Sequence, residues 1–278
     1  MADSGEDPPL LGRAFQRGTV DDPAVALMVR ILDFQDQAPP IRRLRDWALA
    51  GAAVRRGERV VDIGSGTGTM ARELAELVGP EGSVTGVEPN PVLRELAEER
   101  SDGTEVTYVD GTAAALPFPD ESVDLVWCER VLQHVDDAQA ALHEMARVLR
   151  PGGRALVLDA DHGSNVESDL SRHVETALQD AFLSRVPNPY AARHLPRQAI
   201  AAGFTVDPDI GSSALLFPQE VLEDAARLRQ AGAAAVADGT LSVDEVVTAL
   251  AAQKEAARKG WAFSAVTVFA FLLGKPRA

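Results

Sequence analysis

One stretch constrains the fold of this chain more than any other, because a strand pattern, alternate glycines and a helical pattern follow one another without a gap. Arg59 to Ile63 is short, apolar and rich in β-branched residues, which is typical of a buried strand. Gly64, Gly66 and Gly68 come directly after it. Apolar residues then recur at helical spacing, at Met70, Leu74, Leu77 and Val78. The stretch therefore predicts a strand, a glycine-rich turn and a helix.

The spacing of these glycines distinguishes between ligands. Because glycine has no Cβ, the backbone can adopt positive φ and press its N–H groups against a ligand at a helix N-terminus. A dinucleotide fingerprint needs glycine at its first, third and sixth positions. Counted from Gly64, the fifth position is Gly68 and the sixth is Thr69, so that fingerprint is not met. A nicotinamide-dependent oxidoreductase is therefore disfavoured, and a glycine-rich loop without a ligand is the plainest alternative.

Strand and helix patterns alternate over the following hundred residues. Further strands are expected at residues 83–88, 105–110, 122–128 and 154–159. This alternation predicts a parallel sheet with right-handed crossovers. Ligands of such sheets bind at the carboxyl ends of the strands, where the strand order reverses. One crevice could therefore collect the polar residues at these ends, namely Asp62, Glu88, Asp110 and Cys128.

Two of these carboxylates have specific candidate roles. Glu88 lies about 20 residues past the glycine turn, the position at which an acid accepts hydrogen bonds from a ribose diol. Asn90 and Pro91 follow it as a helix N-cap and first helical residue. Asp110 could bind an exocyclic amine, but Asp110-Gly111 is also an ordinary turn pair.

The pattern Asp62-x-Gly64-x-Gly66-x-Gly68 resembles motif I of the class I S-adenosylmethionine-dependent methyltransferases. The segment from Val131 to Leu149-Arg150-Pro151-Gly152-Gly153 is similar to the ubiquinone/menaquinone-type and natural-product small-molecule methyltransferases. The resemblance implies an α/β fold: a doubly wound, mostly parallel, seven-stranded Rossmann-like sheet with an antiparallel last strand and helical lid elements.

The resemblance also implies the cofactor and its contacts. S-adenosylmethionine would be bound and S-adenosylhomocysteine released. The glycine turn would wrap the methionine part, and the end of the fourth strand would lie beside it. The residues expected to contact the cofactor are Asp62, Gly64, Ser65, Gly66, Gly68, Glu88, Pro89, Asp110, Gly111, Thr112, Cys128, Glu129 and Arg130.

The composition restricts the binding partners and the cellular compartment that can be expected for this chain. The net charge of −15 argues against nucleic-acid binding, since nucleic-acid binders concentrate Lys and Arg. A single cysteine suits a reducing compartment, and no apolar run reaches membrane-spanning length. We expect a cytoplasmic protein with a small-molecule substrate and no membrane partner. The sequence leaves open whether the protein forms a homodimer.

The 278 residues are expected to form one methyltransferase domain. It would comprise a helical cap over about 1–53, a cofactor half over 54–160, and a substrate side over 161–278 with a helical insertion at about 218–260. Met1 to Gly12 is expected to be mobile. The cap should hold two helices broken by Pro39-Pro40. The resemblance makes them part of a lid, and simple surface packing is the alternative.

The substrate side is less informative. Ser164-x-x-Glu167 and Ser242-x-x-Glu245 each predict a capping box that starts a helix. A helix is also expected over 196–203, with Pro196 at its start, and an Ala-rich one over 221–236. Strands are expected within 204–217 and over 262–273, the last buried on both faces.

The function that follows is methyl transfer to a small molecule by in-line displacement, placed in bacterial secondary-metabolite biosynthesis on resemblance alone. Positioning supplies much of the rate of such a reaction, so a catalytic residue need not be obvious. His162 and His134 are the catalytic candidates, each with an ordinary loop or helix-start histidine as the alternative. No metal site is expected, because zinc-type and calcium-type spacings are absent from the sequence. The alternative function is a cofactor-binding protein of the same fold that catalyses a non-methylating rearrangement or cyclisation.

Overall fold

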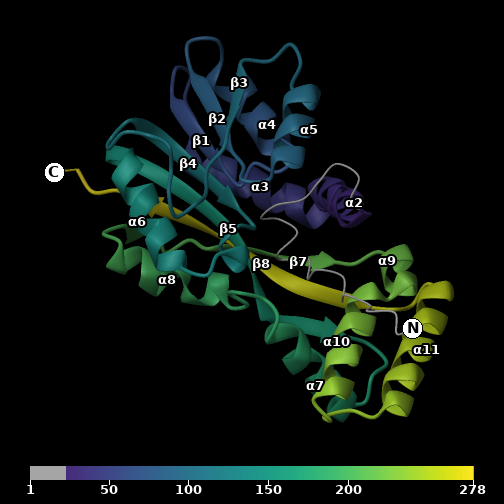
Figure 1. Cartoon of the computed structure of the whole chain (residues 1–278). Helices are drawn as coiled ribbons and strands as arrows, with labels where there is room; N and C mark the ends of the chain where they lie inside the picture. Colours follow the sequence, from purple (N-terminus) through teal and green to yellow (C-terminus); the bar gives the residue numbers. More distant parts are fainter. Residues whose placement is uncertain (1–22, 278) are drawn as a thin grey trace, which may run out of the picture.

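The structure is a computed structural model that describes residues 23–277, so the mobility expected for Met1 to Gly12 lies outside it (Figure 1). Its helices are α2 (Pro23–Gln37), α3 (Pro39–Ala52), α4 (Thr69–Val78), α5 (Pro91–Arg100), η1 (Leu132–His134), α6 (Ala138–Val148), α7 (Arg172–Leu183), α8 (Ala191–Ala201), α9 (Gln219–Asp224), α10 (Ala226–Ala237) and α11 (Val243–Arg258). Its strands are β1 (Arg59–Ile63), β2 (Ser83–Val87), β3 (Val106–Val109), β4 (Val123–Glu129), β5 (Leu149–Glu167), β6 (Thr205–Val206), β7 (Gly211–Leu216) and β8 (Ser264–Gly274).

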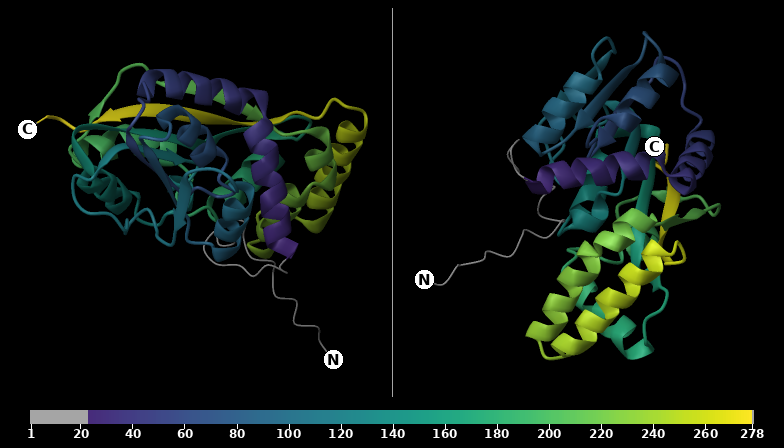
Figure 2. Two further views of the ribbon diagram at one scale, coloured as in Figure 1. Left: turned by 90° about the horizontal axis from the view of Figure 1, so that it is seen from above. Right: turned by 90° about the vertical axis from the view of Figure 1, so that its right-hand side faces the viewer.

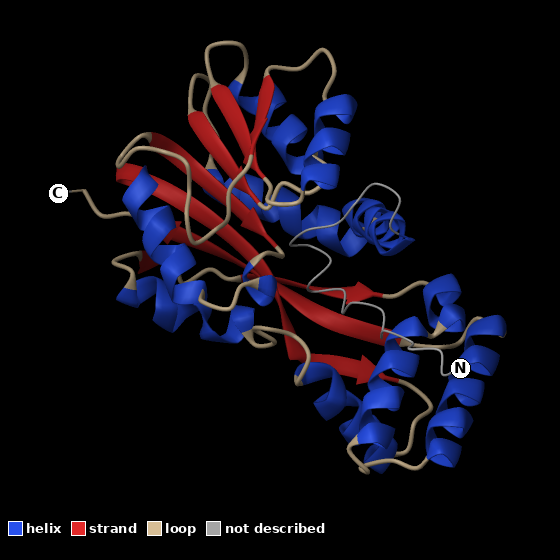
Figure 3. Ribbon diagram, viewed as in Figure 1, coloured by secondary structure: helices blue, strands red, loops and turns tan. Residues whose placement is uncertain are grey.

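These strands form one mixed sheet in the order β3-β2-β1-β4-β5-β8-β6, with β7 also paired to β8 (Figure 3). The strands β1 to β5 are parallel, and β8 runs antiparallel to β5, β6 and β7. The fold class and the antiparallel last strand between its neighbours are therefore confirmed. The sheet has eight strands and not seven, because the strand expected within 204–217 is split into β6 and β7, which pair with successive parts of β8.

Alternate residues of each strand divide the core between the two faces of the sheet. Ile63, Cys128 and Val157 pack in a cluster with α6 and α8. Val60, Trp127 and Leu156 point the other way and pack with α3 and α4. The parallel strands are apolar on both faces for this reason, as expected for a sheet covered by helices on each side.

A group of helices lies away from the main sheet (Figure 2). α7, α10 and α11 pack around a separate apolar cluster, which is rich in alanine and leucine and includes Leu178, Ala235 and Ala249. Figure 3 shows β5 and β8 as the two long strands that reach from the sheet to these helices. Their outer parts pair as far as Glu167 and Ser264. The helical group is therefore connected to the main sheet through the long strands β5 and β8.

Local sequence signals succeeded where the capping chemistry was unambiguous. Asn90 accepts hydrogen bonds from the N–H groups of Val92 and Leu93, and Ser242 and Glu245 form a reciprocal capping box. The two cap helices also break at Pro39, as predicted.

Three predictions on the substrate side were wrong. Ser164-x-x-Glu167 lies inside β5, and Ser171 is the actual N-cap of α7. Pro196 lies inside α8, which begins at Ala191. The helix expected over 221–236 is broken at Ala225, which has a φ of 55°.

No helix among the described residues is both long and apolar enough to span a bilayer.

Candidate functional site

The glycine turn has the backbone that its sequence requires. Gly64, Gly66 and Gly68 have φ values of 65°, 53° and 78°, which side-chain-bearing residues rarely adopt. The amides of Gly64 and Ser65 donate to the carbonyl of Val87, and the Gly68 amide donates to the Ser65 carbonyl. The amide of Gly66 donates to the carboxylate of Glu88, at 3.0 Å. The glycines allow the backbone to fold tightly and to border a ligand closely, while their amides bond within the protein.

Each glycine meets a different neighbour. A Cβ on Gly64 would lie 2.5 Å from Cγ2 of Val131, and a Cβ on Gly68 would overlap the hydroxyl of Tyr108. On Gly66 the nearest atom would be Cδ1 of Leu32, at 3.5 Å. Packing therefore requires glycine at positions 64 and 68, whereas at Gly66 the main requirement is the positive φ.

A cavity of about 1730 Å³ lies at the carboxyl ends of β1, β2, β3 and β4, where the strand order reverses between β1 and β4. Residues of α2, α7 and α10 complete its wall. Most of the sequence-predicted site residues line it: Asp62, Gly64, Ser65, Gly66, Glu88, Pro89, Asp110, Gly111, Thr112, Glu129, Arg130, His134 and His162.

Two predicted contacts, Gly68 and Cys128, are not brought to the cavity wall. Cys128 is fully buried among apolar residues on the α6 side of the sheet, because its neighbours Trp127 and Glu129 take the opposite face. Burial raises the pKa of its thiol well above the ordinary value. Gly68 faces Tyr108. The prediction that these two residues touch the cofactor therefore has no support from side-chain placement.

Glu88 and Asp110 lie in contrasting environments. The Glu88 carboxylate is 4% exposed and accepts hydrogen bonds from the amides of Gly66, at 3.0 Å, and Asn90, at 2.9 Å. Burial raises its pKa to about 7, although these two hydrogen bonds act in the opposite direction. The Asp110 side chain is 78% exposed and has one long contact with Arg94, at 3.5 Å.

A buried ionic network fastens the cap helices to the end of β4. Arg45 of α3 pairs with Glu129, at 2.8 Å, and with Asp36 of α2, at 2.6 Å. Arg130 pairs with the same oxygen of Asp36, at 3.0 Å. All four side chains are at most 11% exposed. The placement of α2 and α3 against the predicted cofactor site is therefore set by charge as well as by apolar packing.

Arg130 of this network and Asp62, whose pKa responds to the charges of the network, keep buried polar atoms without a hydrogen-bond partner among the described residues. They are Oδ2 of Asp62 and both Nε and Nη1 of Arg130. Burial, together with the charge of Glu129, raises the pKa of Asp62 well above its ordinary value. Arg130 itself has a φ of 59°, an uncommon value for a residue with a side chain. Buried polar groups are rarely left unpaired, so both positions call for a ligand.

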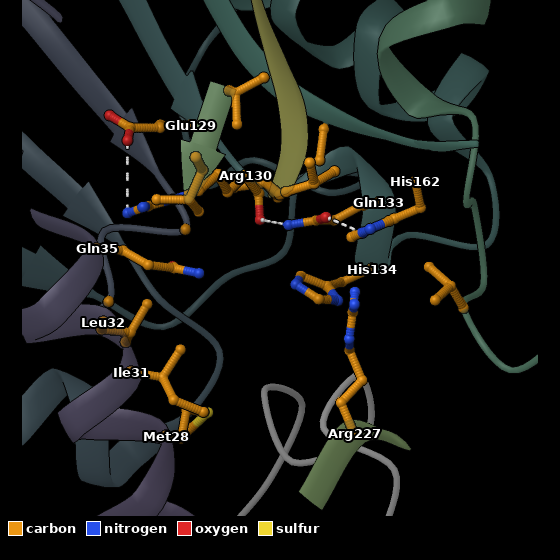
Figure 4. A pocket seen from close by; sticks show the side chains of 18 of the residues that line it. Met28, Ile31, Leu32, Gln35, Glu129, Arg130, Gln133, His134, His162 and Arg227 are labelled. Carbon is orange, nitrogen blue, oxygen red and sulfur yellow. Dashed lines mark hydrogen bonds and ion pairs between the residues drawn. The ribbon is translucent and has the colours of Figure 1, made fainter. Parts of the chain in front are cut away.

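The other half of the cavity contains a second polar group, which Figure 4 shows from close by. Nε2 of His162 lies 2.7 Å from Oε1 of Gln133, whose amide nitrogen donates to the carbonyl of Arg130. Burial lowers the pKa of His162 to about 4 and that of His134 to about 3. Arg227 of α10 extends toward the two histidines (Figure 4).

Sequence reasoning missed Asp36, Arg45, Gln133 and Arg227. Arg45 carried a usable signal, because it falls on the apolar face of α3 with Ile41, Leu44 and Ala48. A charged residue on a buried helical face requires a buried partner. The other three carry no local signal, since their importance depends on contacts distant in sequence. Among residues 23–277, no cluster of three or more His, Cys, Asp or Glu residues could hold a metal ion.

Comparisons with known proteins agree with this geometry. The family model described as "Methyltransferase domain" matches residues 61–157, the segment from β1 to β5. A protein of Streptomyces fradiae, described as an uncharacterized 37.1 kDa protein in transposon TN4556, is 31% identical over 94% of this chain and 73% of its own length.

A ubiquinone/menaquinone biosynthesis C-methyltransferase, UbiE of Hahella chejuensis, is 40% identical over 41% of this chain. The chain covers 47% of that relative, about half of its length. The crystal structure of the [4+2]-cyclase SpnF matches 85% of this chain and 81% of its own, with a TM-score of 0.53 and 22% identity, a likeness of fold. The chain belongs to the class I S-adenosylmethionine-dependent methyltransferases, as its motif I and its Arg-Pro-Gly-Gly segment predicted.

Proposed function

We propose that this protein binds S-adenosylmethionine in the β1–β4 half of the cavity and transfers its methyl group to a small molecule held in the other half. The observation that carries the proposal is the pair of unsatisfied buried groups at the strand-order reversal. A carboxylate oxygen of Asp62 and two guanidinium nitrogens of Arg130 lack partners among the described residues. An α-amino and an α-carboxylate group would satisfy them, and the methionine part of the cofactor carries both.

The remaining residues fit the rest of the cofactor. Glu88 offers a buried carboxylate for the ribose hydroxyls, and Asp110 borders the same cavity for the adenine amine. When bound, the cofactor supplies a methyl group on a positively charged sulfur. The protein would hold the acceptor in line with it and exclude water. The volume of about 1730 Å³ exceeds the ordinary range for a small-molecule pocket, which is roughly 300–1,000 Å³, so it could hold a sizeable metabolite beside the cofactor.

We further propose a role in bacterial secondary metabolism, which the size of the cavity and the bacterial relatives support. The second candidate is a non-methylating rearrangement or cyclisation, favoured by the likeness of fold to the [4+2]-cyclase SpnF. Transfer of an isotope-labelled methyl group separates the two. Label recovered in a product supports methyl transfer. Conversion of a substrate that needs bound cofactor but carries no label supports the second candidate.

Cofactor binding is tested by thermal unfolding. A ligand at a hundred times its Kd stabilises the native state by about 2.7 kcal/mol. For a domain of this size, S-adenosylhomocysteine should therefore raise Tm by roughly 5–10 °C, and NAD should not. The variant Asp62→Asn replaces a buried carboxyl, whose pKa burial has already raised, by a neutral amide of similar shape, so the free protein should stay folded.

In Asp62→Asn the shift caused by S-adenosylhomocysteine should nevertheless shrink, because a hydrogen bond to a charged group is worth about 1.5–3 kcal/mol. Asp46→Asn is the matched control, since Asp46 is exposed on α3 and does not line the cavity. Stabilisation of the wild type by NAD alone, or an unchanged shift in Asp62→Asn, would refute the proposal.

A further inference from the structure

The tautomer of His162 is defined by its hydrogen-bond network. The amide nitrogen of Gln133 donates to the carbonyl of Arg130, at 3.2 Å, and a carbonyl can only accept. Oε1 of Gln133 therefore faces His162, where it lies 2.7 Å from Nε2. Because Oε1 can only accept, Nε2 of His162 carries the hydrogen. The other ring nitrogen, Nδ1, then carries the lone pair, and it has no hydrogen-bond partner among the described residues.

His162 is held in its neutral form. Burial and, to a smaller extent, the positive charge of Arg227 lower the pKa of its ring to about 4, and the charge of Asp161 acts in the opposite direction. Asp161 is itself paired with Arg193, at 2.8 Å, which weakens its effect. At neutral pH the side chain is therefore an uncharged imidazole that can accept a hydrogen bond or a proton at Nδ1.

Arg227 supplies a cation beside this acceptor. Its guanidinium lies over the rings of Phe182, at 5.4 Å, and Phe217, at 5.1 Å. Its Nη2 contacts Glu167 and Ser264. Both polar contacts use this one nitrogen, so among residues 23–277 no partner occupies the N–H groups of Nε and Nη1, which a ligand can use. The side chain is 30% exposed, and it borders the cavity (Figure 4).

The ring of Phe182 brings the two groups together. It contacts the guanidinium of Arg227 and also the ring of His162, with centroids 5.3 Å apart. A hydrogen-bond acceptor and a cation therefore contact the same aromatic side chain in the acceptor half of the cavity. Phe217 adds a second ring in contact with the guanidinium. This combination suits a planar, apolar molecule with one polarised oxygen.

We propose that the methyl acceptor is an acidic hydroxyl, of a phenol or enol, bound between Nδ1 of His162 and the guanidinium of Arg227, with Gln133 as the residue that positions His162. The inference rests on the proposed methyl transfer and specifies its acceptor. In the activating step the O–H bond breaks and its electron pair stays on the oxygen. The proton bonds to the lone pair of Nδ1, and Arg227 stabilises the oxyanion that becomes the nucleophile.

Other acceptors fit these groups less well. A protonated amine would be repelled by Arg227 and could not donate its proton to a carboxylate already paired with that arginine. An aliphatic alcohol is too weak an acid for an imidazole whose pKa is lowered to about 4. A phenol or enol is the stronger acid, and the same positive charge that suppresses protonation of His162 favours its ionised form.

The test uses 4-nitrophenol, whose phenolate absorbs at longer wavelength than the phenol, so that ionisation is read without turnover. With S-adenosylhomocysteine present and at a pH below the pKa of the free phenol, the wild type should raise the phenolate-to-phenol ratio of bound probe about tenfold. Arg227→Met should abolish that increase. Arg229→Met should retain it, because Arg229 lies on the same helix, is 52% exposed and does not line the cavity. 4-Nitroanisole, which cannot ionise, is the probe control.

The positioning role is tested by the ¹⁵N chemical shifts of the His162 ring. The wild type should show hydrogen on Nε2 and a bare Nδ1. Gln133→Leu should give a mixture of tautomers, and Gln133→Glu should restore the wild-type pattern because a carboxylate still accepts from Nε2. The Tm shift with S-adenosylhomocysteine is recorded for every variant. If that shift is absent in the wild type, the proposed function fails. If it is present but the phenolate ratio does not rise, or Nδ1 carries the hydrogen, the acceptor inference alone is overturned.

Discussion

Glu88 shows how one buried side chain can support both the fold and the site. Its carboxylate accepts from the amides of Gly66 and Asn90, so it joins the glycine turn to the start of α5. Burial raises its pKa to about 7, which places its ionisation in the physiological range. Ribose hydroxyls would donate hydrogen bonds to the ionised carboxylate. Protonation of the carboxyl would remove these hydrogen bonds.

We therefore predict that affinity for S-adenosylhomocysteine falls as the pH is lowered from 8 to 6. The direction follows because binding favours the carboxylate, which is present above pH 7 and lost below it. Calorimetry at each pH measures the change, which cannot exceed about tenfold per pH unit for one proton. His162 and His134 do not titrate in this window, since burial lowers their pKa values to about 4 and 3.

Glu88→Gln separates this effect from that of Asp159, a buried carboxyl whose pKa is also raised to about 7. The variant should bind S-adenosylhomocysteine about 1.5–3 kcal/mol more weakly at pH 8 and lose most of the pH dependence. If the pH dependence persists unchanged in Glu88→Gln, the ionisation of Glu88 is not its source.

At the scale of elements, the N-terminal helices are held by charge. Arg45 of α3 is 4% exposed and is shared by Glu129 and Asp36. Burial raises the pKa of Asp36, but Arg130 and Arg45 outweigh that effect and keep it below the ordinary value. Removing one member of such a network leaves charges buried without compensation.

Arg45→Met should therefore lower the free energy of unfolding by about 3–5 kcal/mol. Arg43→Met, at an exposed position of the same helix, should change it by no more than about 0.5 kcal/mol. Urea unfolding measures both. Equal effects in the two variants would mean that the network of Arg45 contributes no more to stability than a surface charge.

The elements that could be predicted from sequence are those whose signals are local. The alternate glycines, the Asn90 cap and the Ser242 capping box are each complete within a few residues, and the structure contains all three. Ser164 and Glu167 have the same spacing as a capping box, but both lie in β5. There, pairing of Glu167 with Ser264 across the sheet outweighs a local helical preference. Partners distant in sequence leave no such signal, which is why Gln133 and Arg227 were missed.

For the molecule as a whole, the apolar clusters imply unequal stability. The sheet lies between two large clusters that contain Trp127, Leu142 and Met145. The group of α7, α10 and α11 has a smaller cluster, in which seven of the ten buried members are alanine or valine. Small side chains bury less apolar area, and the hydrophobic contribution scales with that area. The helical group should therefore open at a lower free energy than the sheet.

Native-state hydrogen exchange tests this prediction. Amides of α10 and α11 should exchange with an opening free energy lower by on the order of 2 kcal/mol than amides of β1 and β4. Ala235→Gly, at a fully buried position in α10, should lower the opening energy of α10 and α11 together by about 1 kcal/mol and leave β1 unchanged. Because Arg227 lies on α10, the same opening would carry the proposed acceptor site away from the cofactor half. Uniform exchange energies across both regions would show instead that the sheet and the helical group unfold as one cooperative unit.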